Sequence, residues 1–323
     1  MKPLIAIAAL MASLFAAQAL AQTAYPNRPV KLVVPYAAGG ASDVLARVVA
    51  QGISDKLGQQ VIVENKAGAG IVVGTEFVAR SRPDGYTLLI TTLAHATSPS
   101  LFKKLPYDTI HDLEPIAMVA TLPLVLCVNP NLIPATDLKG VIEFFRANPG
   151  KYNYSSGGKG SVVHLASELF NSQANLQIQH IPYKGGAPAM TALLSGDVAY
   201  YIDVVSTAQQ FVKSKRVNAI AVTSSERSHV FPDTPTMKEG GLSDYDAYTW
   251  NVVLVPRGLL PAITAKLNAV VNAAVADPAV SKRLLDLGAK PVTDSTPGSL
   301  EPYIRAEMVK WARIIKASGI QPE

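Results

Sequence analysis

Short apolar runs alternate along the chain with longer segments in which apolar residues recur every three or four positions. The first unit, Val30 to Asp43, predicts a buried strand, a glycine turn and the start of a helix that ends at Gly58. Further strands are predicted at 61–64 and 86–91, with a helix at 70–80 between them. This alternation of strand and helix indicates an α/β architecture with mostly parallel strands.

Two apolar stretches are too long for an average strand and predict crossings between two domains. One runs from 116 to 128, and the other from 245 to 255. The first domain is then discontinuous, with residues 22–120 and 248–323, and the second, residues 121–247, is inserted into it. We expect the crossings to act as a hinge, because motion between domains is the default; two rigidly packed domains are the alternative.

The segments between and beyond the crossings repeat the order of strand, loop and helix. The predicted elements are strands at 152–155, 178–181 and 199–202 and helices near His164, from Ala187, and at 207–213, 263–275, 281–287 and 300–316. Apolar residues make up 49% of the 323 residues, which is enough for two cores. The single cysteine, Cys127, lies in an apolar run, so no intramolecular disulfide is possible.

The N-terminus has the pattern of a secretory signal peptide. Lys2 precedes an apolar run from residue 3 to 17, and Ala19 and Ala21 are the small residues that a signal peptidase requires. The run is shorter than the roughly 18 residues expected of a membrane span. We expect cleavage after Ala21 and export; a buried N-terminal helix is the alternative. The net charge of +5 includes no run of Lys or Arg, which argues against nucleic acid as a partner.

The turn between the first strand and the first helix is a candidate anion site. Within Tyr36 to Asp43 two glycines precede the helix, so unpaired backbone N–H groups and the positive end of the helix point to one place. An anion can bind there without a cationic side chain. Ser42 or Asp43 is expected to cap the helix.

Four more loops follow predicted strands, where ligands of parallel sheets bind. They are 91–95, 155–161, 183–188 and 203–206. The loop at 183–188 brings a second pair of glycines, Gly185 and Gly186, to the start of a helix, so the two domains could hold a small anion from opposite sides. Taken alone, each loop is explained by a tight turn without function.

Catalytic and cofactor motifs are absent from the sequence. There is no G-x-S-x-G turn, no H-E-x-x-H and no P-loop, and Gly68 to Gly74 does not have the spacing of a dinucleotide site. The five histidines are scattered, so we expect neither a metal nor a cofactor. The one titratable pair that an enzyme could use is His164 with Asp203.

An ordered set of landmarks resembles the tripartite tricarboxylate transporter receptor family, the Bug-type periplasmic solute-binding proteins. The landmarks are 25–29, 35–47, 64–70, 83–88, 183–188, 196–198 and 219–224, and they span most of the mature chain. The resemblance implies a two-lobed, periplasmic-binding-protein-like fold. In it, two α/β domains are joined by two crossing segments and enclose a ligand cleft.

The resemblance also implies a periplasmic receptor, not an enzyme, that closes on a small organic carboxylate, either an aliphatic dicarboxylate or an aromatic carboxylate. It would act as a monomer and deliver the ligand to membrane transporter subunits. A sensor for a membrane signalling partner and a secreted enzyme acting on small carboxylates are the alternatives. The ligand-binding residues expected from the loops and the resemblance are Tyr36, Ala38, Gly39, Gly40, Ala41, Ser42, Asp43, Thr91, Thr92, Ser156, Gly157, Ser161, His164, Lys184, Gly185, Gly186, Ala187 and Asp203.

Overall fold

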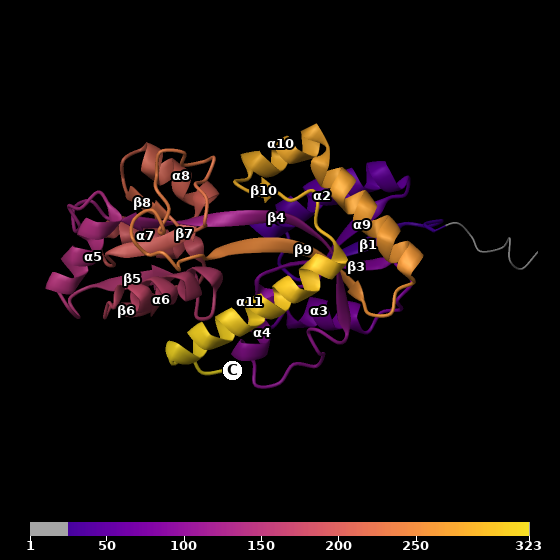
Figure 1. Cartoon of the computed structure of the whole chain (residues 1–323), viewed down its shortest axis with the longest axis horizontal. Helices are drawn as coiled ribbons and strands as arrows, with labels where there is room; N and C mark the ends of the chain where they lie inside the picture. The colour runs from indigo at the N-terminus through magenta and orange to yellow at the C-terminus, as the bar shows by residue number, and fades with distance from the viewer. Residues whose placement is uncertain (1–24, 323) are drawn as a thin grey trace, which may run out of the picture.

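Two α/β lobes lie side by side and are connected by the long strands β4 (Leu113–Val128) and β9 (Tyr248–Pro256) (Figure 1). The structure is a computed structural model that describes residues 25–322. The predicted signal peptide, residues 1–21, lies outside the described residues. Within the described segment, no helix combines the length and the hydropathy that a membrane span requires.

The first lobe is built on three parallel strands, with β1 in the centre. The strands, in order across the sheet, are β2 (Val61–Asn65), β1 (Val30–Val34) and β3 (Thr87–Thr92). The helices are α2 (Ala41–Leu57), α3 (Val72–Ala79) and α4 (Ala94–Leu101). Leu32 and Val33, whose side chains point to opposite faces of the sheet, are both fully buried, as expected for a central strand covered on both faces. Gly58, with φ of 71°, ends α2 as predicted.

The strand order reverses between β1 and β3. The chain passes from β1 through α2 to β2 at the edge, and then returns across β1 to β3 on the other side. The loops that leave β1 and β3 therefore diverge and open a crevice at the carboxyl ends of the strands, where ligands of α/β sheets bind. In the first lobe this crevice lies beside the glycine turn that follows β1.

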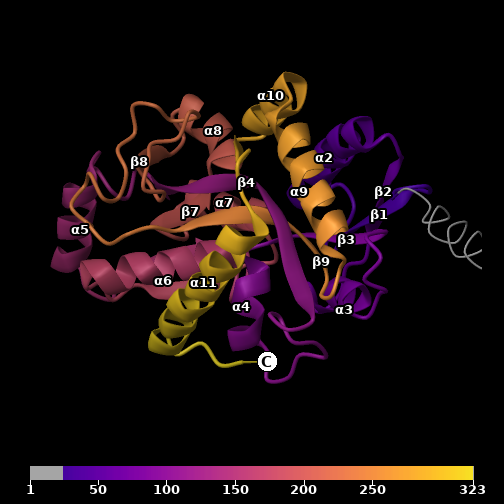
Figure 2. The same cartoon turned by 45° about the vertical axis from the view of Figure 1, so that its right-hand side comes forward.

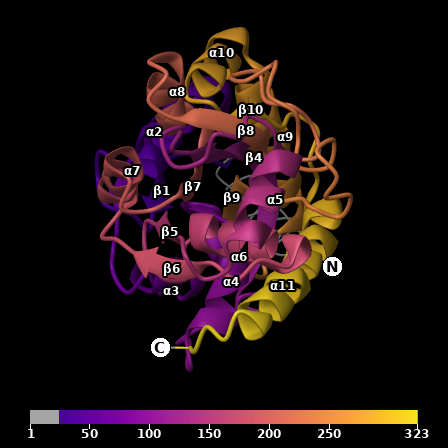
Figure 3. The ribbon, with the colours of Figure 1, turned by 90° about the vertical axis from the view of Figure 1, so that its left-hand side faces the viewer.

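The second lobe repeats this plan, with β5 in the centre of three parallel strands. Its strands, in order, are β7 (Tyr200–Val204), β5 (Asn153–Ser156) and β6 (Gln179–Pro182), and its other elements are α5 (Leu138–Ala147), α6 (Val162–Ala174), α7 (Gly186–Ser195), α8 (Val205–Lys213) and β8 (Asn218–Val222). Helices α6 and α7 lie on opposite sides of these strands (Figure 3), as right-handed crossovers require. The strand order here reverses between β5 and β7.

Strand β4 belongs to both sheets. Residues 113–123 pair with β9, and residues 124–128 pair with β7. These pairs are antiparallel, because the chain leaves the first lobe along β4 and returns along β9. The prediction of mostly parallel strands is therefore wrong for the centre of the molecule, and it holds only within the three-stranded unit of each lobe.

The C-terminal elements complete both lobes. Helices α9 (Pro261–Ala276) and α10 (Pro278–Asp286) pack on α2 in the first lobe. Strand β10 (Lys290–Pro291) pairs with β4. Helix α11 (Pro297–Ala317) lies across the molecule and contacts α4 of the first lobe and α6 of the second (Figures 1 and 2). Both lobes are thus connected by a helix as well as by strands.

Two segments that were predicted to be loops form the ends of strands and the starts of helices instead. The predicted loop at 91–95 includes the end of β3 and the start of α4. The α4 sequence is rich in Ser, Thr and Ala and contains Pro99, so it has no clear helical period, and its contacts with α11 stabilise it. The predicted loop at 203–206 is also absent, because β7 runs to Val204 and α8 begins at Val205.

Candidate functional site

The strand-order reversals of the two lobes face each other, and two cavities lie between them. The larger has a volume of about 530 Å³ and the smaller about 330 Å³. Tyr36, two residues after the end of β1, lines both cavities. Its hydroxyl is hydrogen-bonded to Thr92 Oγ1 over 2.6 Å, which holds the ring at the boundary between the cavities.

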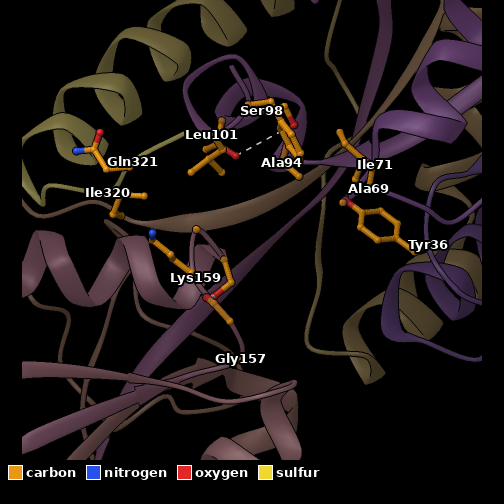
Figure 4. A pocket seen from close by; sticks show the side chains of 16 residues that line it. Tyr36, Ala69, Ile71, Ala94, Ser98, Leu101, Gly157, Lys159, Ile320 and Gln321 are labelled. Atoms are coloured by element: carbon orange, nitrogen blue, oxygen red, sulfur yellow. Dashed lines mark hydrogen bonds between the residues drawn. The ribbon is translucent and has the colours of Figure 1, made fainter. Parts of the chain in front are cut away.

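The larger cavity takes its wall from both lobes (Figure 4). The first lobe contributes the loop before α3 and one face of α4, and the second contributes the loop after β5. Among the described residues that form this wall, Lys159 alone carries a charge. The lining residues are Tyr36, Ala69, Gly70, Ile71, Ala94, Thr97, Ser98, Leu101, Phe102, Gly157, Gly158, Lys159, Gly160, Ser161, Ile320 and Gln321.

The smaller cavity lies beside the start of α2. Ala41 and Ser42 line it from the first lobe, and Ser206 and Thr207 line it from α8 in the second. Its charged lining residue is Asp286, at the end of α10. The other lining residues are Tyr36, Leu45, Thr92, Leu122, Val162, Val204, Thr249, Asn251 and Leu287. The two cavities therefore differ in the sign of the charge that borders them.

Asp43 holds the glycine turn in place. Gly39, with φ of 81°, donates its backbone N–H to Asp43 Oδ2 over 2.8 Å. Arg47 and Asn65 also donate to this carboxylate. Burial acts to raise the pKa of Asp43, but the hydrogen bonds from Arg47, Gly39 and Asn65 outweigh it and keep the pKa below its usual value. The side chain of Asp43 is therefore engaged within the turn.

The first turn of α2 presents N–H groups that no side chain caps. The prediction that Ser42 or Asp43 caps the helix is wrong, because Gly40 is the N-cap residue and Asp43 bonds to the preceding turn. The first N–H group to donate within the helix is that of Val44, to the carbonyl oxygen of Gly40, so the helix itself offers no acceptor to the N–H groups of Ala41 and Ser42. Both residues line the smaller cavity, where a carboxylate oxygen could accept these hydrogen bonds.

Two histidines anchor residues 157–161, which we call the cavity loop. Ser161 caps α6, and its Oγ accepts a hydrogen bond from the backbone of His164. Gly160, with φ of 75°, donates its N–H to Nδ1 of His164 over 2.9 Å. Ser156 Oγ, at the end of β5, is hydrogen-bonded to His180 Nε2 over 2.7 Å. Histidine side chains thus fix both ends of the loop.

The two histidines are stacked, with ring centroids 3.8 Å apart. Burial, together with the smaller effects of the nearby His180 and Lys159, lowers the pKa of His164 to about 3. Burial and Lys159 lower the pKa of His180 to about 4. Both rings are therefore neutral at neutral pH, and Lys159 is the charge that the second lobe presents to the larger cavity.

The other glycine loop of the second lobe, residues 183–186, lies after the outermost strand β6, and we call it the edge loop. Neither it nor Ala187 lines a cavity, and Lys184 and Gly186 are exposed. Gly185 donates its N–H to the carbonyl oxygen of Gly157 over 3.1 Å. The edge loop therefore supports the cavity loop from outside.

Other predicted residues lie behind the cavity walls. Asp203 is buried in β7, where burial raises its pKa and the Val204 N–H donates to its carboxylate over 2.8 Å. Within residues 25–322, no hydrogen bond or ion pair joins Asp203 to His164. The predicted residues that line a cavity are Tyr36, Ala41, Ser42, Thr92, Gly157 and Ser161, and those that line neither are Ala38, Gly39, Gly40, Asp43, Thr91, Ser156, His164, Lys184, Gly185, Gly186, Ala187 and Asp203.

Several cavity residues were not predicted. Lys159 lies inside a predicted loop, and its position between two glycines was the signal that could have identified it. Ser98 on α4 and Asn251 on β9 carry no such signal, because only tertiary structure brings them to the cavities. Over the described part of the chain, no three His, Cys, Asp or Glu side chains gather closely enough to hold a metal ion.

Known proteins are similar to this chain in sequence and in fold. The family model described as tripartite tricarboxylate transporter family receptor matches residues 45–320. Protein BugT of Bordetella pertussis is 39% identical over 297 residues, which cover 91% of this chain and 90% of that protein.

Two solved structures show the same likeness. The structure of periplasmic binding protein BugD is 35% identical, and the match covers 93% of this chain and all of that one, with a TM-score of 0.76. The structure of R. palustris Rpa4515 with adipate is 31% identical, with 93% of this chain and 100% of that chain covered and a TM-score of 0.79. The predicted two-lobed fold of periplasmic binding proteins is thereby confirmed. The chain belongs to the tripartite tricarboxylate transporter receptor family, a family of solute-binding proteins.

Proposed function

We propose that this protein is a periplasmic receptor that captures a small organic carboxylate between its lobes and delivers it to the membrane subunits of a tripartite tricarboxylate-type transporter. The main support is the pair of cavities where the strand-order reversals of both lobes meet. Their volumes suit a small acid with its ordered water. The similarity to Rpa4515, whose structure was solved with adipate, supports an aliphatic dicarboxylate more than an aromatic carboxylate.

In this proposal, backbone groups of the first lobe bind one carboxylate. The N–H groups of Ala41 and Ser42 and the positive end of α2 point to one place, and Thr92 adds a hydroxyl group. From the second lobe, Gly157 and Ser161 contact the part of the ligand that lies in the larger cavity. Some predicted residues that line neither cavity support the site indirectly: Asp43 fixes the glycine turn, and the edge loop at 183–186 supports Gly157.

Closure of the cleft is proposed to be a hinge motion at the two crossing strands. Strand β4 changes its pairing partner between Pro123 and Leu124, and β9 begins opposite this point at Tyr248. The moving units are residues 22–120 with 248–323, and residues 121–247. A ligand stabilises the closed state only through contacts that the open state lacks, which requires that both lobes touch it.

Calorimetric titration of the purified chain tests this function. The panel contains aliphatic dicarboxylates, including adipate, and aromatic monocarboxylates, and each mixture is then analysed for products. We expect saturable binding of at least one acid, no conversion, and a smaller radius of gyration in solution X-ray scattering when the ligand is bound. Conversion of a ligand would establish an enzyme, and absence of binding to every acid would refute the receptor.

Export is tested separately by mass spectrometry of the protein recovered from the periplasm. Removal of the proposed signal peptide leaves a chain that begins at Gln22. A periplasmic product that retains Met1, or retention of the whole protein in the cytoplasm, would contradict this part of the proposal.

A further inference from the structure

Lys159 has an unusual setting among the lysines of this chain. It lies in the wall of the larger cavity, and its side chain extends from the cavity loop toward Ile320 and the side of α4 (Figure 4). Within residues 25–322, no hydrogen bond or ion pair engages its ammonium group. A lysine that borders a cavity without a partner has three donors and a charge available for a ligand.

The backbone around Lys159 is constrained. Gly158 and Gly160 on either side have φ of 141° and 75°, which side-chain-bearing residues rarely adopt. The Gly160 N–H is bonded to His164. A Cβ atom on Gly160 would lie 3.0 Å from Leu101 of α4, so the loop touches the first lobe at this point. Lys159 is therefore held where the two lobes meet.

No charge on the described residues of the cavity wall opposes that of Lys159. These residues include no Asp or Glu, and the two histidines behind the loop are neutral at neutral pH. Glu168, the carboxylate nearest to His164, accepts a hydrogen bond from the Tyr154 hydroxyl. The larger cavity is thus electropositive, whereas Asp286 borders the smaller one.

We propose that Lys159 binds a second anionic group of the ligand, so that the receptor selects dicarboxylates over monocarboxylates of the same length. This inference rests on the proposed function. One carboxylate binds the backbone groups at the start of α2, and the ligand passes Tyr36 so that its other carboxylate pairs with Lys159 in the larger cavity. Lys159 then contributes specificity by charge, which backbone N–H groups alone do not provide.

The expected effect is moderate because Lys159 is exposed to solvent. A charge-assisted hydrogen bond contributes more than a neutral one, and removal of the ammonium should weaken dicarboxylate binding about tenfold. Salt screens an exposed pair, so the loss should shrink as the ionic strength rises from about 0.02 to about 0.5 M.

The test compares adipate with its monoacid analogue hexanoate on the wild-type chain and on Lys159→Met. We expect Lys159→Met to weaken adipate binding about tenfold and to leave hexanoate binding within about twofold. Lys159→Arg should retain most of the adipate affinity, because it keeps the charge. Lys213→Met is the matched control, since it removes one exposed charge from the second lobe at the end of α8, away from both cavities.

Equal weakening of adipate and hexanoate, or unchanged adipate affinity in Lys159→Met, would overturn the inference about Lys159. A wild-type chain that binds hexanoate or an aromatic monocarboxylate more tightly than any dicarboxylate would also overturn it, while the receptor function would stand. If the wild type binds no carboxylate of either kind, both proposals fail. The wild-type titration therefore separates failure of the function from failure of the charge assignment.

Discussion

The cavity loop and the edge loop look alike in sequence but occupy different places in the second lobe. Each follows a strand, precedes a helix and contains glycines and one lysine, Lys159 or Lys184. The cavity loop follows the central strand β5, beside the reversal of strand order, and lines the larger cavity. The edge loop follows the outermost strand β6 and lines neither cavity. Sheet order, more than local sequence, thus decides which loop faces a ligand.

The largest effect on ligand affinity is expected for Gly40→Val, beside the reversal of strand order in the first lobe. A branched side chain at the N-cap of α2 would obstruct a carboxylate that approaches the backbone, and binding should fall below detection. The fold should remain intact, because the nearest atom to the new Cβ would be the Ala37 carbonyl oxygen at an ordinary 3.5 Å. Calorimetry and thermal unfolding measure the two quantities. Unchanged affinity would mean that the anion does not bind at this turn.

Gly157→Val tests the contact between the two loops. Its Cβ would lie 3.3 Å from backbone atoms of Gly185 and Gly186, so the loops must separate. We expect affinity to fall about tenfold and the free energy of unfolding to decrease by about 1–3 kcal/mol. Gly298→Ala, a helical position with no atom within 4 Å of the new Cβ, is the control for both titration and urea unfolding. Wild-type affinity in Gly157→Val would show that the cavity loop need not hold its position.

Acid should weaken the hydrogen bonds that His164 and His180 make to the cavity loop and to Ser156 beside it. The backbone hydrogen bond from Gly185 of the edge loop to Gly157 contains no titrating group. The pKa values of His164 and His180, about 3 and 4, lie below the value near 6.5 of an unfolded histidine, so the unfolded state binds more protons between these limits. Their contribution to stability is fully present above about pH 6.5 and is lost as the pH falls toward 4. Protonation of His164 Nδ1 also removes the acceptor of the Gly160 N–H.

Urea unfolding at about pH 7 and about pH 4.5 measures this loss of stability. The variant His180→Gln should lose less stability between the two values, because one of the stacked rings no longer titrates. Equal losses in the wild type and the variant would contradict the role given to these histidines.

The smallest effect on ligand affinity is expected for Lys184→Met in the edge loop. Its side chain is exposed and borders neither cavity, so we expect any change in affinity for adipate to stay within about twofold. The same titration serves as the measurement. A tenfold loss would show that the edge loop reaches the ligand when the lobes close, as the clamp of two glycine loops inferred from sequence requires.

Much of the fold could be predicted from the sequence, because a segment with a strong apolar periodicity forms the same strand or helix largely independently of its tertiary contacts. β1, α2 and the long strand β4 lie where the apolar pattern places them. Helix α4 was missed, since a segment rich in Ser and Thr forms a helix here through contacts with α11. The antiparallel pairing of β4 with β9 was also missed, because it joins residues far apart in the sequence.

The sequence by itself determined the α/β architecture, the two crossings and the glycine turn after β1, because local spacing and backbone freedom fix these features. Only the tertiary structure decided which loops face each other. It placed Lys159 in a cavity wall and Lys184 outside, and it engaged Asp43 within its own turn. The physical reason is that a cavity is formed by residues from several strands and helices, whose order in the sheet no local pattern contains.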